Sequence, residues 1–201
     1  MKTSLVTTLL ALIVAVASVR ADSAIQLSNV GVGGIVSGTD DAPLGRPGLT
    51  TGVYYAIGDV AAAVNGVIGG ATTRLNRNDG TLAGSGLTLG TGAGSTAVLG
   101  APQWGQYDST TPYVIPGASG DTLVTLVLVA YFGASYESAG TLGRGHSAAF
   151  TMTAVGSPGS PLFTGAYSGE FTVVPEPSPC ALTGLGLASL MIFRRRKQAS
   201  F

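Results

Sequence analysis

The run Gly145 to Ala149, GHSAA, is the stretch of this sequence most similar to a catalytic motif. It approaches the G-x-S-x-G turn in which α/β-hydrolases expose a nucleophilic serine, here Ser147. Such a serine needs a histidine base that is distant in the chain and close in space. His146 is the only histidine, it directly precedes Ser147, and the flanking residues favour a strand. We therefore expect His146 to be a turn residue at a strand entrance, and the protein not to be an enzyme.

Other patterns that bind cofactors or metals are incomplete. The run Gly90 to Ser95, GTGAGS, lacks the third glycine of a dinucleotide loop, and no Gly-Lys-Ser/Thr follows it. One histidine and one cysteine are too few for a zinc site. Asp40 and Asp41 could contribute to a calcium site, but adjacent loop carboxylates are more often only solvated. We expect no cofactor and no metal.

A binding surface is suggested instead by residues 101–117, APQWGQYDSTTPYVIPG. Trp104, Tyr107 and Tyr113 are flat rings that could stack on sugars, with nearby Gln and Asp side chains as hydrogen-bond partners. The alternative is that one or two of these rings pack at the edge of the fold. Nine scattered acids also leave a paired-carboxylate hydrolase open, although their spacing does not support one.

The part of the chain between its two ends is acidic. Residues 22–174 contain four arginines, no lysine and nine carboxylates, a formal charge of −5, although the whole chain is neutral. No stripe of cations could neutralise phosphates, so nucleic acid is not an expected partner. The one cysteine, Cys180, lies beyond this body, which must therefore fold without a disulfide.

The elements that position these residues are predicted to be short strands. Leu123 to Phe132, LVTLVLVAYF, is apolar at every even position and is typical of a central strand buried on both faces. Ala148 to Val155 alternates Phe150, Met152 and Ala154 with threonines, which predicts a strand with one face in water. Further strands are expected at Ile25–Val30, Gly52–Ile57, Thr72–Asn76, Leu87–Leu89, Thr96–Leu99, Tyr113–Ile115 and Glu170–Val174.

Two sequences resemble tight turns between strands. Asn78 to Gly80, NDG, suits a hairpin turn, and Asn65-Gly66 suits another unless residues 59–64, DVAAAV, form a short helix. Seven to ten short strands predict an all-β body of the β-sandwich or jelly-roll type. A β-solenoid is the alternative, but no fixed repeat runs along the body.

The N-terminal residues predict export. Lys2 is followed by the uncharged run Leu5 to Val19, and Val19-Arg20-Ala21 is a small-x-small cleavage site. This order predicts a signal peptide at residues 1–21, cut after Ala21, and an extracellular domain at residues 22–174.

The C-terminal residues predict a membrane anchor. The uncharged run Cys180 to Phe193 would be about 21 Å long as a helix, against a hydrocarbon core of about 30 Å. Such a helix spans the bilayer only with local thinning and snorkelling cations. Four cations follow it, and cations beside a membrane helix stay cytoplasmic, which places the body outside. These cations are Arg194, Arg195, Arg196 and Lys197.

A short motif precedes this helix. Pro175, Glu176 and Pro177, within VPEPS at residues 174–178, complete a three-part ending of motif, apolar helix at 180–193 and basic cluster at 194–197. Residues 175–201 resemble the PEP-CTERM sorting signal of Gram-negative bacteria. The resemblance implies that an exosortase, a membrane-embedded cysteine protease or transpeptidase, recognises the motif, and that the basic cluster stops transfer. The alternative is a plain single-pass anchor with a stiff proline spacer.

The resemblance also implies a location and partners. The protein would be anchored transiently in the inner membrane by its C-terminal helix and then reach the cell surface or the extracellular matrix. Its partners would be signal peptidase, the secretion machinery, an exosortase and exopolysaccharide. We expect a structural or adhesive role linked to exopolysaccharide or biofilm. A carbohydrate-binding module is the second hypothesis, and a secreted hydrolase is the third.

Overall fold

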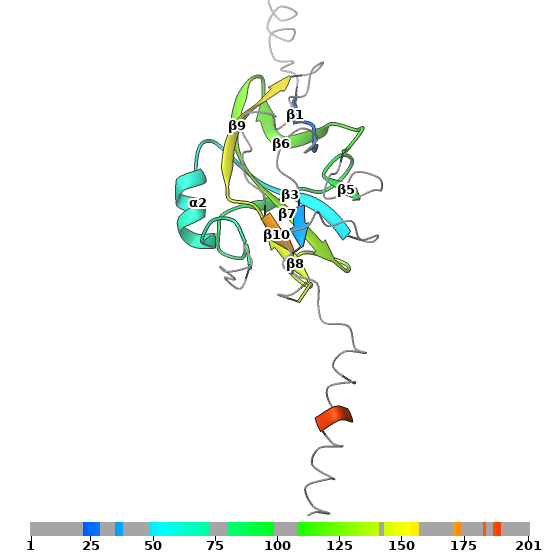
Figure 1. Ribbon diagram of the computed structural model, residues 1–201. Helices are drawn as coiled ribbons and strands as arrows, with labels where there is room; N and C mark the ends of the chain where they lie inside the picture. The colour runs from blue at the N-terminus through cyan, green and yellow to red at the C-terminus, as the bar shows by residue number, and fades with distance from the viewer. Residues whose placement is uncertain are drawn as a thin grey trace, which may run out of the picture.

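The computed structural model describes residues 22–28, 35–37, 49–72, 80–98, 108–140, 143–156, 171–173, 183 and 187–189. The described body is mostly β-strand, with a curled antiparallel sheet and one helix (Figure 1). The helix is α2 (Ala61–Ile68). The strands are β1 (Asp22–Ile25), β2 (Ile35–Ser37), β3 (Leu49–Ile57), β4 (Thr88–Leu89), β5 (Thr96–Val98), β6 (Tyr113–Ser119), β7 (Thr122–Phe132), β8 (Arg144–His146), β9 (Phe150–Gly156) and β10 (Phe171–Val173).

The long strands β3 and β7 form the centre of the sheet. They pair antiparallel along the whole of β3, from Leu49 opposite Phe132 to Ile57 opposite Val124. Successive side chains of a strand point to opposite faces. On β7 the even-numbered residues face one core cluster, on what is here called the inner face, and the odd-numbered residues from Val127 to Tyr131 face another, on the outer face. Since β7 is buried on both faces, the central strand predicted at Leu123–Phe132 is confirmed.

The sheet curls around its inner face. Its strand order is β4-β3-β7-β9-β1-β6, with β5 also paired to β3 and β8 also paired to β7. Tyr113 of β6 nevertheless packs edge-on against Tyr55 of β3, with 6.1 Å between ring centroids. A Cβ added to Gly90, next to β4, would lie 3.2 Å from the Tyr113 ring. The two edges of the sheet therefore approach each other and enclose the inner core.

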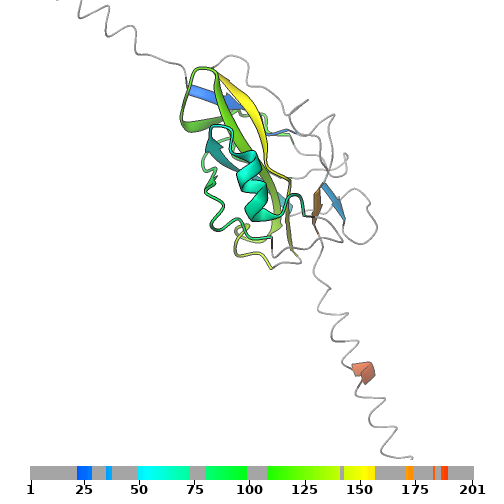
Figure 2. The same cartoon turned by 90° about the vertical axis from the view of Figure 1, so that its left-hand side faces the viewer.

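A second, two-stranded sheet lies against this inner core. β10 pairs in parallel with β2, so that Phe171 lies opposite Ile35 and Val173 opposite Ser37. Phe171 and Val173 are buried in the same cluster as the inner-face residues of β3 and β7. Figure 2 shows β2 and β10 side by side and apart from α2, which covers the other face of the large sheet.

The helix α2 packs on the outer face through Val64 and Ile68. It ends at Gly69, whose φ of 77° is a left-handed conformation that glycine adopts without steric cost. Of the two alternatives for Asn65-Gly66, the helix is therefore the one found and the hairpin turn is wrong.

The side chain of Asn65 takes the place of a strand partner. Its Oδ1 accepts a hydrogen bond from the backbone N–H of Ala149 at 2.7 Å. Its Nδ2 donates to the carbonyl of the same residue at 3.0 Å. The carboxamide thus satisfies both backbone groups of Ala149 just before β9 begins, and it fixes α2 to the sheet.

Most of the other predicted strands are present with shifted ends. In β9, Met152 and Ala154 are buried while Thr153 is exposed, which confirms the predicted alternation. β3, β4, β5, β6 and β10 each overlap a predicted strand. β1 begins at Asp22 rather than Ile25, because Asp22 pairs with β6, and Ser23 and Ala24 pair with β9.

Several predicted elements lie outside the described residues. They include residues 73–79, with most of the strand expected at Thr72–Asn76 and two residues of the NDG turn, as well as the signal peptide at 1–21 and most of the sorting signal at 175–201. Thr183 and residues 187–189 are helical. In the described part of the chain, no helix combines the length and the apolar character that crossing a membrane requires. The domain limits therefore stay predictions.

Candidate functional site

The GHSAA stretch forms β8 and the connection that leads to β9. His146 lies in β8 opposite Val129, and its side chain is buried. The prediction that it is a turn residue is therefore wrong, because pairing with β7 continues through His146. Its Nδ1 lies 2.8 Å from the carbonyl oxygen of Ser147.

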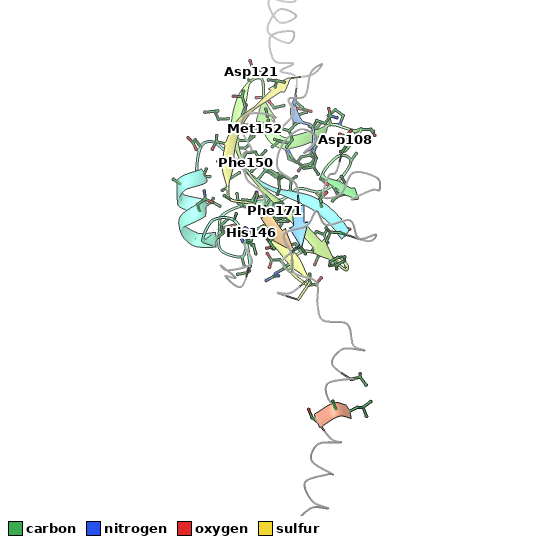
Figure 3. All side chains as sticks on the ribbon, in the orientation of Figure 1. Asp108, Asp121, His146, Phe150, Met152 and Phe171 are labelled. Carbon is green, nitrogen blue, oxygen red and sulfur yellow. The ribbon has the colours of Figure 1, made fainter. Side chains whose placement is uncertain are left out.

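Ser147 is buried as well, and its hydroxyl is bonded to the backbone. Its Oγ donates to the carbonyl of Ala148 at 2.8 Å and accepts from the N–H of Leu128 at 3.0 Å. A hydroxyl has one proton, and a nucleophilic serine must give that proton to its base. Here the proton is directed at a carbonyl, so Ser147 fastens the β8–β9 connection to β7. Figure 3 shows Asp108 and Asp121 well away from His146, so neither supplies a third member of a triad.

The aromatic stretch contributes a core residue. Tyr113 is 2% exposed and packs with Tyr55 inside the curled sheet, so its ring cannot stack on a sugar from solvent. For Tyr113 the packing alternative is the one found. Asp108 is exposed, and its Oδ1 accepts a long hydrogen bond of 3.4 Å from Nε2 of Gln26. Trp104 and Tyr107 lie outside the described residues.

The glycines of residues 90–95 allow close approach between the two edges of the sheet. A Cβ on Gly94 would lie 2.5 Å from the carbonyl oxygen of Thr111, just before β6, and Gly94 has a φ of 78°. Gly90 donates its N–H to the carbonyl of Val53 at 2.8 Å. These contacts give the glycines a structural role. No cluster of three metal-ligating side chains occurs among the described residues, and Asp40 and Asp41 are outside them.

Titratable side chains converge on the outer face, in a group here called the tyrosine–arginine cluster: Tyr54, Tyr131, Tyr136, Glu137 and Arg144. The guanidinium carbon of Arg144 lies 4.9 Å from the centroid of the Tyr136 ring. Tyr54 and Tyr131 pack edge-on against the same ring, at 6.1 and 6.3 Å. Nη1 of Arg144 also lies 3.0 Å from the carbonyl of Tyr136 and 3.4 Å from the Glu137 carboxylate.

This cluster holds the two loops that cover the outer face. The hydroxyl of Tyr136 donates to the carbonyl of Gly80. The Glu137 carboxylate accepts from the N–H of Leu82 at 3.1 Å and from Oγ1 of Thr81 at 3.2 Å. The cluster thus ties residues 80–82 to the loop after β7. No sequence pattern predicts this cluster, because its members come from three separate segments and follow no spacing rule.

The electrostatics of the cluster match a structural role. Burial raises the pKa of the Tyr54 and Tyr131 phenols above the usual 10.0, and for Tyr54 the Glu137 carboxylate adds to this effect while Arg144 opposes it. These phenols are therefore neutral near pH 7 and poorly suited to act as bases. The arrangement can stabilise loops, and it holds its cation against the face of the Tyr136 ring.

The C-terminal edge of the body is well anchored. The N–H of Thr172 donates to the carbonyl of Thr72 at 2.9 Å, and Phe171 and Val173 are almost fully buried. A Cβ on Gly145 of β8 would overlap the carbonyl oxygen of Thr172, so β10 crosses β8 in close contact. The predicted motif begins at Pro175, two residues after Val173, and Pro175, Glu176 and Pro177 lie outside the described residues, as do Arg194 to Lys197.

Comparisons with known proteins give no relative. No protein-family model matches the chain, no curated protein matches it, and no solved structure matches its fold.

Proposed function

We propose that this protein is exported and sorted at the inner membrane through its C-terminal segment, and that its folded body is displayed at the cell surface or in the extracellular matrix. The observation that carries the proposal is the order of the last 29 residues. They contain a lone glutamate between two prolines, then an uncharged run of 14 residues, then four cations. An ordinary stiff spacer has no reason to place an acid between its prolines.

An exosortase-type enzyme would be the processing partner. In this proposal Pro175, Glu176 and Pro177 form the recognised motif, residues 180–193 the transient membrane helix and Arg194 to Lys197 the stop-transfer cluster. The signal peptide at residues 1–21 supports the same topology, because it sends the body out while the terminal cations stay inside.

We propose a structural or adhesive role for the body, linked to exopolysaccharide. In this view the large curled sheet and the β2–β10 pair are the two layers of a β-sandwich or jelly-roll-like domain. Asn65, Tyr136 and Ser147 bond to the backbone with their side chains, which suits such a role better than catalysis. The hydrolase hypothesis loses support from the bonds of Ser147, and the carbohydrate-binding hypothesis loses Tyr113 from its three rings.

Replacing the motif residues in the full chain tests the sorting proposal. In the double variant Glu176→Gln with Pro177→Ala, we expect the protein to accumulate in the inner-membrane fraction of its producing bacterium. The matched control is Glu170→Gln with Pro161→Ala, the same two chemical changes outside the motif, which should fractionate like the wild type. Equal surface delivery of the double variant and the control would refute recognition of this motif.

A further inference from the structure

We propose that β10 limits processing of the C-terminal segment. While β10 is docked on β2 and β8, the processing enzyme cannot bind Pro175 to Pro177, because the folded body is too close to them. The enzyme acts when β10 detaches. This inference rests on the proposed sorting function and adds a regulatory step to it.

β10 is held from several sides although it has only three residues. It makes a parallel ladder with β2. The N–H of Thr172 donates to the carbonyl of Thr72, and the carbonyl of Thr172 lies against Gly145. Phe171 and Val173 contribute two nearly fully buried side chains to the inner core. The last described strand of the body is therefore an integral part of the core, and detaching it exposes apolar surface.

The distance between this strand and the motif is very short. Only Val174 separates Val173 from Pro175, and one residue spans at most about 3.6 Å. Extended peptides are commonly recognised through main-chain hydrogen bonds, and in this proposal the processing enzyme binds the residues on both sides of the motif in this way. Residues just upstream of Pro175 have these main-chain groups committed to β2 and Thr72. The enzyme and the body therefore compete for the same short segment.

The order of export makes this competition unavoidable. A chain with an N-terminal signal peptide leaves the cytoplasm N-terminus first. The docking partners of β10 are β2, Thr72 and β8, all of which precede it in the chain. They are already outside when the motif reaches the membrane, so β10 can dock before processing. The predicted cut after Ala21 differs, because β1 pairs with β6 and β9, which emerge much later.

Two changes to the full chain, made in its producing bacterium, test the role of β10. The first inserts six Gly/Ser residues between Val174 and Pro175, which separates the motif from the core and leaves β10 intact. The second is Gly145→Ala, whose Cβ overlaps the Thr172 carbonyl. Overpacking of this size raises the detached population by roughly 5- to 150-fold. We expect both variants to shorten the half-time of C-terminal processing severalfold in a pulse-chase experiment.

Each variant has a matched control. The same six-residue insertion between Ser178 and Pro179 lifts the body from the membrane equally but leaves Val173 and Pro175 as close as before, so it should give no acceleration. Gly52→Ala places a Cβ at an ordinary 3.4 Å from Val129, and its half-time should equal the wild-type value.

The outcomes separate this inference from the sorting proposal. Wild-type half-times for both the upstream insertion and Gly145→Ala would overturn the role of β10 while leaving sorting intact. Equal acceleration by the two insertions would also overturn it, because distance from the membrane would then be the limiting factor. A wild-type chain that is never processed would overturn both proposals.

Discussion

The hydrogen bonds of Asn65 give the sharpest prediction about the body. Asn65→Ala removes the two bonds that join α2 to the backbone of Ala149. Ala149 is only 7% exposed, so its N–H and carbonyl lose partners that water replaces poorly. Each unsatisfied buried group costs about 1–3 kcal/mol, and alanine regains about half a kcal/mol through its better helix propensity. For the two groups together, we expect the free energy of unfolding to fall by about 1.5–5.5 kcal/mol.

This loss is measurable by urea unfolding and by thermal unfolding of residues 22–174, both followed by circular dichroism. A body of this size should show a fall in Tm of roughly 3–20 °C. Val67→Ala is the control on the same helix, since Val67 is exposed, and it should change stability by less than about 0.5 kcal/mol. A loss for Asn65→Ala no larger than that of Val67→Ala would refute the account of α2 attachment.

Asn65→Asp tests which group donates and which accepts in the two hydrogen bonds to Ala149. Its carboxylate can still accept from the N–H of Ala149, but its second oxygen faces the Ala149 carbonyl, so the variant is destabilised at pH 7. Protonation restores a donor toward that carbonyl. The stability gap to the wild type should therefore narrow as the pH falls to about 4 and below. A gap that widens on acidification would contradict this geometry.

Three further predictions concern the loops and the sheet edges. Glu137→Ala should speed hydrogen exchange at the Leu82 amide and cost about 1–2 kcal/mol, whereas unchanged exchange would show that the carboxylate does not hold this loop. Gly94→Ala should cost about 1–3 kcal/mol, because its Cβ meets the Thr111 carbonyl and its φ is positive; equal denaturation midpoints would refute close approach of the edges. Above about pH 10 stability should fall as pH rises, because the unfolded chain releases protons from phenols whose pKa is raised in the folded state, and a flat alkaline stability profile would refute this. These phenols are Tyr54, Tyr113 and Tyr131.

The central strands were predictable because the pattern of apolar residues along each segment indicates which of its faces are buried. In Leu123–Phe132 apolar residues occupy both faces, and in Phe150–Gly156 they alternate with threonine, so periodicity alone identified β7 and β9. Periodicity could not decide between a helix and a hairpin turn in the α2 segment. Asn65-Gly66 suits a turn locally, and the helix is favoured by a tertiary contact, because Asn65 pairs with Ala149 from a distant segment.

Residue type alone could not decide the roles of Tyr113 and His146, because these depend on tertiary placement. Tyr113 has the composition of a sugar-stacking residue, but the curl of the sheet buries it against Tyr55. His146 has the neighbours of a turn residue, but it pairs with Val129 of β7. The predictions for the two ends of the chain differ in kind, because an export or sorting signal is linear and is predicted from residue order without tertiary placement.

Mass spectrometry of the mature protein tests the central claim most directly. The full chain would be expressed in its natural host, recovered from the cell surface or medium, and sequenced at both ends. We expect an N-terminus at or near Asp22 and a C-terminus at or near residues 174–178, without the basic cluster. A surface form that retains Arg194 to Phe201 would contradict processing of the tail and leave only a membrane anchor.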